Sequence, residues 1–593
     1  MQSAFAILSN KEPTMSRQVT HASTILLAIG ASVLAGCATQ PIPPSPATAT
    51  ITVPTIQRPQ GETPQWWFRN GAAQAAQASS QAHANDQHAK NVIVFLGDGM
   101  SIPDIAAAHV LAGQRQGVDG ESYRLSFEKF PFSALSRTYE TDQQTPDSAG
   151  TMTAIMTGVK TRAGFIGVSQ VPHRQDCAGS HGQELVTTLE LAAAAGMSTG
   201  AVTTTRITHA TPAATYGHLP ERNWEVDAAM PPAARAQGCQ DFATQLIDFP
   251  VGGGLTVAMG GGRTEFLPSG VADPEYPGKH GQRRDGRNLI DAWTSSHPDG
   301  GYVWNESQLK ALDLAHTPRL LGLFQPSHMN YEHDRPHDQA GEPSLAEMTA
   351  SAIEVLKQNP NGFFLMVEGG RIDHALHAGN AYRALDETIS FADAVAAALA
   401  HTDPADTLIV VTADHSHTMT FAGYPRRGNP ILGKVEGATD SYDEDSARGL
   451  AKDGSGKPYT TLGFYSGPGY TGASDQQPEG AKHFPHEPKA YQGITHGRPD
   501  LTNVDTTDPD YMQEATVPLG SETHGGEDVA IFANGPGAAA FHGELEENAI
   551  FHVIVQHAPR IRAELCRLGS CNADGVPVDR PTYQTWLREV GKR

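Results

Sequence analysis

Acidic and histidine residues flank four apolar runs that have the length of strands. The runs cover 92–96, 363–367, 408–412 and 529–533. The flanking side chains that could bind metal are Asp98, Glu368, Asp373, His377, Asp414, His415 and His524. A single carboxylate at a strand end is usually a helix cap, but four strand ends that carry carboxylate and imidazole groups predict a zinc or magnesium site.

The spacing of Asp373 and His377 supports this interpretation. They are four residues apart, so a helix over this segment places both side chains on one face, where they can hold one ion. Sites in open α/β sheets gather outside the carboxyl ends of the strands. We therefore expect the strand ends to meet around bound metal.

Ser148 is the candidate nucleophile. It lies in TPDSAGT at 145–151, where Pro146 and Asp147 can turn the chain and the small residues can begin a helix with a positive N-terminal end. Taken alone, the segment favours a plain N-cap serine. Beside a metal cluster, however, a serine can be ionised by coordination without a Ser-His-Asp triad.

The elements that must position these residues are strands and helices in alternation. The four apolar runs, together with a fifth at 200–204, are separated by amphipathic segments of helix length. This alternation predicts an α/β fold with a large, mostly parallel central sheet and helices on both faces.

The composition limits the partners of the chain. It has 593 residues, 39% of them hydrophobic, with 65 acidic and 42 basic residues and a net charge of -23. Such a field repels nucleic acid, so we expect no nucleic-acid-binding role. An anionic substrate would need local positive charge, which bound metal ions can supply.

The N-terminus has the form of an export signal. An apolar run at 25–36 follows Lys11 and Arg17 and is too short to span a bilayer. The ending LAGC at 34–37 resembles a bacterial lipobox, which predicts a lipidated Cys37. The alternative is an ordinary signal peptide with a chance cysteine. The remaining cysteines are Cys177, Cys239, Cys566 and Cys571, an even number that suits two disulfides in an exported protein.

Six longer motifs carry a family resemblance. They are GDGM at 97–100, PDSAGT at 146–151, TTTRITHATPAATYGHLPERNW at 203–224, GFFLMVEGGRIDHALH at 362–377, TADHSHT at 412–418 and ETHGGEDVAIFA at 522–533. These motifs resemble alkaline phosphatases, the animal-type enzymes more than the short enteric bacterial type. The resemblance extends from about Gln65 to near Cys571.

The sequence pattern and the resemblance together divide the chain. The apolar run and the composition predict a signal peptide at 1–36, a Pro/Ala/Thr-rich tether at 37–64 and a helical arm at 65–90, and the resemblance implies the phosphatase domain at 91–571, followed by a tail at 572–593. A crown-like insertion would cover about 423–522, and the family forms homodimers.

The resemblance also implies catalytic roles and metal ligands. Ser148 would become phosphoserine, and Arg222 would clamp the phosphoryl oxygens. The first of two zinc ions would be held by Asp373, His377 and His524, and the second by Asp98, Asp414 and His415. Asp98 would also border one magnesium ion, completed by Thr211 and Glu368. The supporting neighbours would be His209, Asp147, His374 and His417.

Further expectations from the resemblance concern a fourth metal and the cysteines. A calcium-like site would use Glu275, the Phe324 carbonyl, Gln325 and Glu342. Gln325 stands where an acidic residue is expected, which removes one charge from the site. The disulfides would join Cys177 to Cys239 and Cys566 to Cys571.

These features together predict an alkaline phosphatase that hydrolyses phosphomonoesters outside the cytoplasm, anchored to a bacterial membrane through Cys37. The outer membrane is favoured because Ala38, and not Asp, follows the cysteine. Two alternatives remain at this stage. A phosphodiesterase or sulfatase of the same superfamily would lack Thr211, Glu368 and Arg222 as a set, and a non-catalytic binding lipoprotein would have no use for Ser148.

Overall fold

The computed structural model describes residues 61–84, 86–437, 449–472, 480–485 and 498–591. The predicted signal peptide, Cys37 and nearly all of the predicted tether lie outside the described residues. Within the described part of the chain, no helix is long and apolar enough to cross a membrane.

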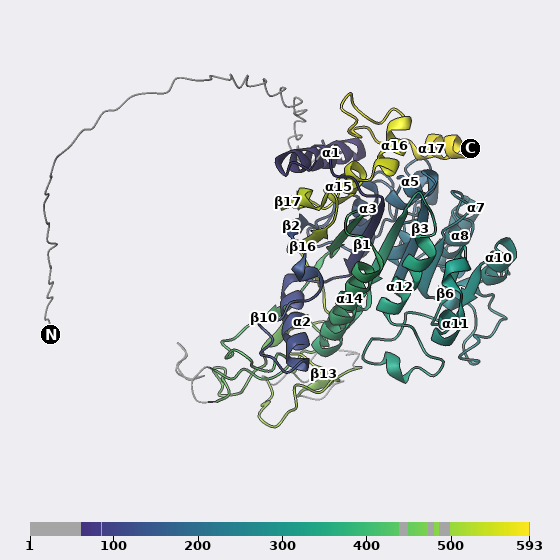
Figure 1. The fold of residues 1–593 in the computed structure, drawn as a ribbon. Coiled ribbons are helices and arrows are strands. Elements are labelled where there is room, and N and C mark those ends of the chain that lie inside the picture. The colour runs from purple at the N-terminus through teal and green to yellow at the C-terminus, as the bar shows by residue number, and fades with distance from the viewer. Residues whose placement is uncertain (1–60, 85, 438–448, 473–479, 486–497, 592–593) are drawn as a thin grey trace, which may run out of the picture. The chain divides into compact units, whose positions relative to one another are not determined.

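A ten-stranded sheet forms the centre of the fold (Figure 1). In spatial order its strands are β17 (Gly543–Glu546), β2 (Phe132–Arg137), β16 (Val529–Asn534), β8 (Thr407–Thr412), β1 (Asn91–Gly97), β7 (Phe363–Gly369), β3 (Ser198–Arg206), β4 (Val257–Gly261), β6 (Leu320–Leu323) and β5 (Gly301–Val303). Within this sheet only β16 runs antiparallel to its neighbours, β2 and β8.

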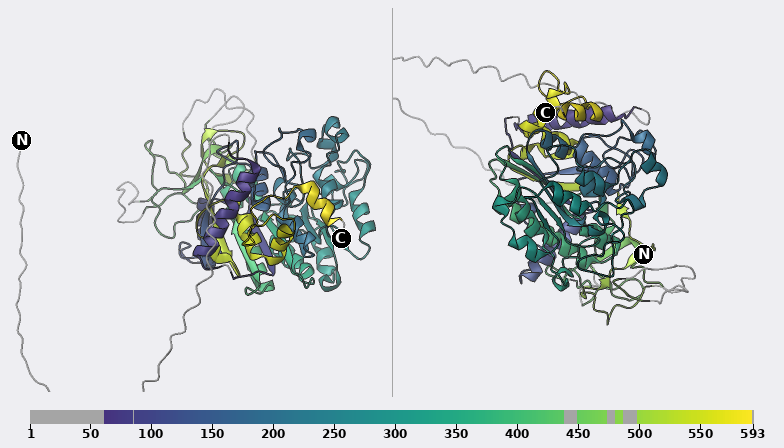
Figure 2. Two further views of the ribbon diagram at one scale, coloured as in Figure 1. Left: turned by 90° about the horizontal axis from the view of Figure 1, so that it is seen from above. Right: turned by 90° about the vertical axis from the view of Figure 1, so that its right-hand side faces the viewer.

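Segments from the two ends of the described chain lie side by side (Figure 2). Helix α1 (Pro64–Gln81) is capped by Thr63, whose side chain accepts from the Trp66 N–H. It packs on α15 (Ala549–His557), where the rings of Phe68 and Phe551 are 5.8 Å apart. The buried face of α1 is therefore covered by the chain itself.

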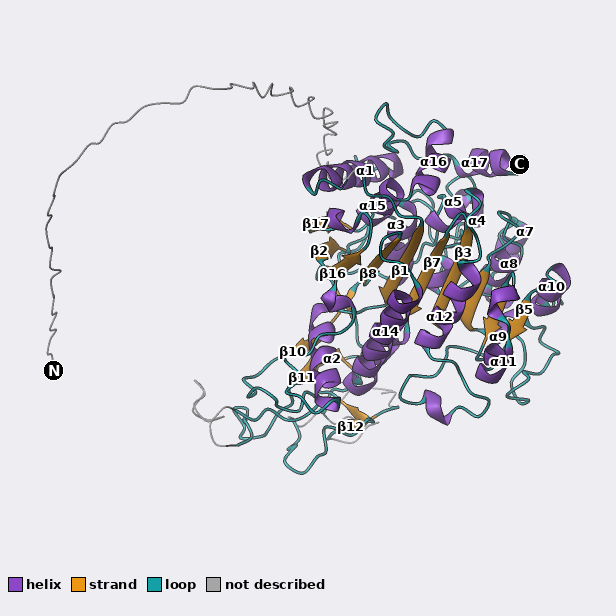
Figure 3. Cartoon of the chain, viewed as in Figure 1, coloured by secondary structure: helices purple, strands orange, loops and turns teal. Residues whose placement is uncertain are grey.

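Helices cover both faces of the sheet (Figure 3). Alternate residues of β1 point to opposite faces, so Val92 and Val94 enter one hydrophobic core while Ile93 and Phe95 enter the other. The first core is covered by α1, α3 (Ser148–Thr157), α4 (Cys177–Ser180), α5 (Thr188–Ala194), α6 (Ala210–Ala213), α7 (Pro232–Ala236), α8 (Phe242–Ile247), α9 (Arg263–Phe266), α10 (Leu289–Ser296), α15, α16 (Pro559–Arg567) and α17 (Tyr583–Val590). The second is covered by α2 (Ile102–Arg115), α11 (Glu306–Ala311), α12 (Leu345–Leu356), α13 (Arg371–His377) and α14 (Ala381–His401). The predicted fold class is confirmed.

All five predicted strands are present, and the direction of β16 explains one feature of the sequence. The metal-binding candidates follow β1 and β8, whereas His524 precedes β16. Because β16 is antiparallel, its beginning lies at the same edge of the sheet as the ends of β1 and β8. A residue before one strand therefore joins residues that follow the others.

Residues 423–522 contribute small sheets at their described positions. Strands β10 (Met419–Phe421), β11 (Leu462–Gly467) and β14 (Ala515–Pro518) form one, and β12 (Lys482–His483) pairs with β13 (Tyr511–Met512). Strand β15 (His524–Gly525) pairs with β9 (Ser416–His417) and so ties His524 to the segment after β8.

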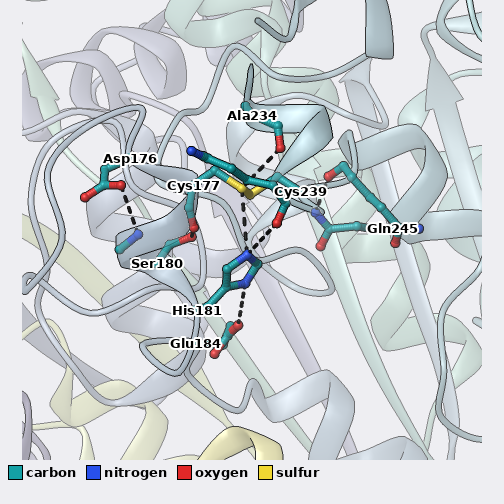
Figure 4. Close-up of a disulfide and its surroundings, with 11 residues drawn as sticks. Asp176, Cys177, Ser180, His181, Glu184, Ala234, Cys239 and Gln245 are labelled. Carbon is teal, nitrogen blue, oxygen red and sulfur yellow. Dashed lines mark hydrogen bonds and ion pairs between the residues drawn. A yellow bond between two sulfur atoms is a disulfide. The ribbon is translucent and has the colours of Figure 1, made fainter. Parts of the chain in front are cut away.

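Both expected disulfides are present: Cys177 is bonded to Cys239, and Cys566 to Cys571. His181 lies beside the first of them, and its Nε2 is 3.0 Å from the Gln237 carbonyl (Figure 4). Cys177, His181 and Cys239 lie close enough to resemble a metal site. Because the two sulfur atoms are bonded to each other, they are not available as thiolate ligands.

Candidate active site

The edge of the sheet gathers the predicted metal-binding residues from separate elements. Asp98 follows β1, Glu368 lies within β7, and Asp414 follows β8. Asp373 and His377 lie on α13, one turn apart as the spacing predicts. Asp98, Glu368 and Asp414 are fully buried, which is unusual for carboxylates without partners.

Asp373, His377 and His524 converge on one point. The Nε2 atoms of the two histidines are 3.0 Å apart, and they lie 3.3 and 3.4 Å from Asp373 Oδ1. The other ring nitrogens face backbone carbonyls, since His377 Nδ1 is 2.7 Å from the Glu522 oxygen and His524 Nδ1 is 2.7 Å from the Pro146 oxygen. These contacts keep the proton on Nδ1 and aim the Nε2 lone pairs at the shared point.

His417 lies beside this group, but both of its ring nitrogens are occupied. Nε2 contacts Asp373 Oδ1 at 2.7 Å, and Nδ1 bonds to the carboxylate of Glu522. His417 therefore orients Asp373, as expected of a neighbour.

Asp98, Asp414 and His415 form a second group. His415 Nε2 is 3.3 Å from Asp98 Oδ1 and 3.6 Å from Asp414 Oδ2. Burial, followed by the charge of Asp98, raises the pKa of Asp414 to about 7. The raised pKa shows that a second negative charge beside Asp98 is unfavourable at this buried position unless a cation compensates it.

Glu368 and His209 lie near Asp98, and Thr211 lies near Glu368. Ligand atoms of Asp98, His209 and Glu368 lie within 4.8 Å of one another. Burial and the charge of Asp98 raise the pKa of Glu368 well above its ordinary value. The His209 ring is neutral, because burial and the Arg222 charge hold its pKa well below the usual range.

Four buried oxygens show whether these groups could hold metal ions. Within the described residues, Asp98 Oδ2, Asp414 Oδ2, Glu368 Oε1 and Thr211 Oγ1 have no hydrogen-bond partner. Buried polar atoms are rarely left in this state. Hard divalent cations bind such oxygens, so the residues present fit zinc and magnesium.

Ser148 is the first residue of α3, and it does not cap the helix. Asp147 is the N-cap and accepts from the Gly150 N–H at 3.1 Å. The Ser148 hydroxyl is left free for other contacts, 3.0 Å from His415 Nε2 and 3.2 Å from Asp98 Oδ1. The plain N-cap interpretation is therefore wrong, because the residue before the serine performs that role.

Asp147 also positions Arg222. Its Oδ2 accepts from Arg222 Nη1 at 3.0 Å, and the Gly164 N–H donates to both of its oxygens. Burial opposes ionisation of Asp147, but the Arg222 charge and the hydrogen bonds to Asp147 together outweigh it and hold the pKa well below the usual range. One ionised carboxylate thus fixes both the nucleophile helix and the arginine.

A cavity of about 310 Å³ opens onto Ser148, Arg222 and the group of Asp373, His377 and His524. Its lining residues are Ser148, Arg206, His209, Arg222, Asn223, Glu225, Asp373, His374, His377 and His524. His374 lies in its wall, where its Nδ1 contacts Arg371 Nη1 at 2.9 Å. A larger cavity, lined by α1 and β17, contains none of the candidate catalytic residues.

Sequence reasoning missed three acidic residues of this region. Glu522 holds His417 and accepts from the Thr418 N–H at 2.6 Å. Glu225 pairs with Arg206 at 2.6 Å in the cavity wall. Glu140 lies buried beneath α3, where a side chain at Gly150 would collide with it. Only Glu522 had a sequence signal, as the first residue of the ETHGGED motif.

The expected fourth site has a different arrangement. Glu275 Oε2 accepts from Arg263 Nη2 at 3.1 Å, and Glu342 Oε1 accepts from Asn330 Nδ2 at 2.6 Å. Gln325 Nε2 donates to Asp338 Oδ1 at 2.8 Å. Phe324 donates its N–H to the Gly260 carbonyl. The carboxylates of Glu275, Asp338 and Glu342 accept hydrogen bonds from protein donors, in contrast to the active-site oxygens that have no such partner.

A sequence model of the alkaline phosphatase family matches residues 89–559. The chain belongs to the alkaline phosphatase family. Curated alkaline phosphatases agree: the tissue-nonspecific isozyme of Gallus gallus is 42% identical over 84% of this chain and 89% of its own length. The isozyme of Homo sapiens is 40% identical over 86% of this chain and 92% of its own length.

Solved alkaline phosphatases share the fold. The enzyme of Thermus thermophilus has a TM-score of 0.55 at 23% identity, covering 86% of this chain and 96% of that chain. The enzyme of the Antarctic bacterium TAB5 has a TM-score of 0.51 at 21% identity, covering 80% and 98%. As a member of the alkaline phosphatase family, the chain is a metal-dependent phosphatase that acts on phosphomonoesters.

Proposed function

We propose that this chain hydrolyses phosphomonoesters through a phosphoserine at Ser148, with two zinc ions and one magnesium ion. The observation that carries the proposal is the position of the Ser148 hydroxyl. It lies within 3.2 Å of both Asp98 and His415, in one cavity with Arg222.

The size of the barrier supports a metal-assisted reaction. Hydrolysis of a phosphate monoester can require about 10²¹-fold acceleration, whereas general acid–base catalysis supplies about 10²–10⁴-fold. Bound zinc supplies the missing Lewis acidity, stabilising the entering and leaving oxygens and lowering the pKa of the serine hydroxyl.

We assign the ligands by the groups described above. Asp373, His377 and His524 would hold the first zinc. Asp98, Asp414 and His415 would hold the second, and Asp98, Glu368 and Thr211 the magnesium. Three divalent ions outweigh the four carboxylates, which gives a locally positive pocket in a protein of net charge -23.

Arg222 and Ser148 then perform the chemistry. The guanidinium, fixed by Asp147, binds two phosphoryl oxygens in a planar, bidentate manner. Ser148 Oγ loses its proton to water and attacks phosphorus, so that the Oγ–P bond forms as the bond to the alcohol oxygen breaks and that oxygen takes up a proton from water. Water then attacks the phosphoserine and gives up a proton, the Oγ–P bond breaks, Ser148 Oγ is reprotonated, and inorganic phosphate leaves.

One assay tests the proposal. Product release is measured from p-nitrophenyl phosphate, bis(p-nitrophenyl) phosphate and p-nitrophenyl sulfate, before and after chelation and after zinc and magnesium are restored. Rapid monoester turnover that is lost with the metals and returns with them is expected. Faster diester or sulfate turnover would favour the phosphodiesterase or sulfatase alternative, and turnover unaffected by chelation would refute the role of metal.

The sequence also supports a location and an assembly for this activity. We propose that the enzyme is anchored by lipid at Cys37, outside the cytoplasm, with the outer membrane favoured, and that it acts as a homodimer. Several acyl chains give stable anchoring, since each buried CH₂ contributes about 0.8 kcal/mol. Cys37→Ser should release active enzyme from the membrane fraction, and a variant that stays bound through high-salt washing would exclude the anchor.

A further inference from the structure

The amide of Gln325 lies among three acidic side chains, away from the residues that surround Ser148. Gln325 follows β6, and its side chain is buried. Its Nε2 donates to Asp338 Oδ1 at 2.8 Å, and the same amide lies beside Glu342. We call Glu275, Gln325, Asn330, Asp338 and Glu342 the Gln325 cluster.

Protein donors fill the oxygens of Asp338. Besides the Gln325 amide, the Tyr276 hydroxyl and Asn330 Nδ2 donate to its Oδ1 at 3.2 and 3.3 Å. The Gly341 N–H donates to its Oδ2 at 2.8 Å. A cation would have to displace these donors to reach either oxygen.

The two glutamates have donors of their own. Asn330 donates to Glu342 from its side chain at 2.6 Å and from its backbone N–H at 3.1 Å. Glu275 Oε2 forms an ion pair with Arg263 Nη2 at 3.1 Å. The Arg263 side chain is fully buried and also pairs with Asp273. Arg263 supplies a fixed positive charge to this side of the cluster.

The three carboxylates are near enough that the charge of Asp338, after burial, raises the pKa of Glu275 and Glu342, but they do not all lie within 4.8 Å of one another. Among the described residues, the sets of three or more ligand atoms within 4.8 Å of one another lie at the active site and at the Cys177–Cys239 disulfide. Calcium takes six to eight oxygen ligands. If the amide were rotated, Oε1 would face Asp338 Oδ1 at hydrogen-bond distance, and two acceptors repel each other unless a cation lies between them.

We propose that in this chain the Gln325 amide replaces the fourth metal ion of the family. A hydrogen-bond donor lies where the family's acidic residue would face a cation, and the cluster is held together without calcium. Gln325 is thereby a positioning residue for the loop between β6 and α12.

The loop connects the cluster to the active site. It carries His328, whose Nε2 is 2.6 Å from Arg206 Nη1, and whose ring centroid is 4.3 Å from that of His374. Both Arg206 and His374 line the catalytic cavity. The hydrogen bonds of the Gln325 cluster thus hold part of the cavity wall in place without bound calcium.

Calcium binding to the zinc- and magnesium-loaded enzyme tests the proposal. Equilibrium dialysis with radioactive calcium is performed in excess magnesium on wild type, Gln325→Glu and Gln339→Glu. Gln339 is exposed in the same loop, so its variant controls for added charge. We expect no stoichiometric binding by wild type or Gln339→Glu. Gln325→Glu should bind about one calcium per chain, at least ~100-fold more tightly than wild type, and gain thermal stability with calcium.

A further variant, Glu275→Gln, locates any calcium that wild type binds. One calcium bound by wild type and lost in Glu275→Gln would overturn the proposal. Calcium retained in Glu275→Gln lies elsewhere, and the cluster is then calcium-free as proposed. If neither wild type nor Gln325→Glu binds calcium, something other than this amide closes the site, and its assigned role is refuted. Gln325→Glu can be prepared in calcium if it does not fold without the ion.

Discussion

The carboxylates at the sheet edge are more deeply buried than those of the Gln325 cluster, and the two groups differ in how their oxygens are used. At the sheet edge, Asp98, Glu368 and Asp414 each keep a buried oxygen without a hydrogen-bond partner. In the Gln325 cluster, amides, a tyrosine and backbone N–H groups fill the acceptors. Acidic residue type alone therefore does not predict a metal site, and the supply of nearby donors decides the outcome.

Removing the candidate nucleophile should have the largest effect on the activity of the sheet-edge site. Ser148→Ala should abolish the phosphoenzyme and lower kcat by about 10⁴-fold or more, because in the proposed reaction the hydroxyl forms the covalent intermediate. Turnover of p-nitrophenyl phosphate and trapping of labelled phosphoenzyme measure the effect. Zinc content should stay unchanged, and near-normal activity in the metal-loaded variant would end the assignment.

Removing a ligand should empty one metal position. His377→Ala should lose about one zinc per chain and at least ~100-fold in activity, since Lewis acidity contributes several kcal/mol. Elemental analysis of dialysed protein measures the loss. His181→Ala is the control, because His181 lies beside bonded cysteines, and it should keep both the zinc and the activity.

Changing the arginine tests the clamp. Arg222→Lys should lower kcat/KM by about 10–100-fold, because a charged, bidentate hydrogen-bond pair is lost. Steady-state kinetics with p-nitrophenyl phosphate measure this. Arg174→Lys, which alters the half-exposed partner of Glu221, should change kcat/KM little, and an equal loss in both variants would point to a general structural effect.

The smallest expected effect concerns the Gln325 cluster. Burial, with the charge of Asp338, raises the pKa of Glu342 to about 8. A raised carboxyl pKa stabilises the fold below the pKa of the unfolded chain, and this contribution is lost as pH rises through 8. From pH 6.5 to 9, wild type should therefore lose about 2 kcal/mol of unfolding free energy relative to Glu342→Gln.

Chemical denaturation at the two pH values measures this difference. Glu347→Gln is the matched control, because the pKa of Glu347 is lowered and the carboxyl stays ionised across this range. Its difference from wild type should not change with pH. A pH-independent difference for Glu342→Gln would show that Glu342 is already ionised, as a bound cation would cause.

The sequence indicated candidate ligands but not their hydrogen-bond partners. Asp98, Asp373 and Asp414 are candidates because apolar runs of strand length precede them, and the structure brings them to one edge of the sheet. The direction of β16 could not be inferred, since an antiparallel strand has the same apolar pattern as a parallel one. Short strands such as β5 and β6 were missed because three or four residues show little periodicity.

The residues that hold the candidate ligands in place were harder still to predict. Glu522 contacts His417, which is 105 residues away, and Asn330 holds Glu342 from within an irregular loop. Such pairs depend on the path by which loops return to the sheet, and no local sequence pattern indicates that path. The same limit applied to Gln325: the missing charge was visible in the sequence, but the donors that compensate for it were not.

The antiparallel strand β16 also sets an order of events during biosynthesis. Its direction brings His524 to His377, across 147 residues of chain. A chain that emerges from its N-terminus cannot complete the group of Asp373, His377 and His524 until residue 524 of 593 has emerged and β16 has paired. Nascent or truncated chains therefore cannot assemble the full metal centre, so that hydrolytic activity appears only once almost the whole polypeptide has been delivered.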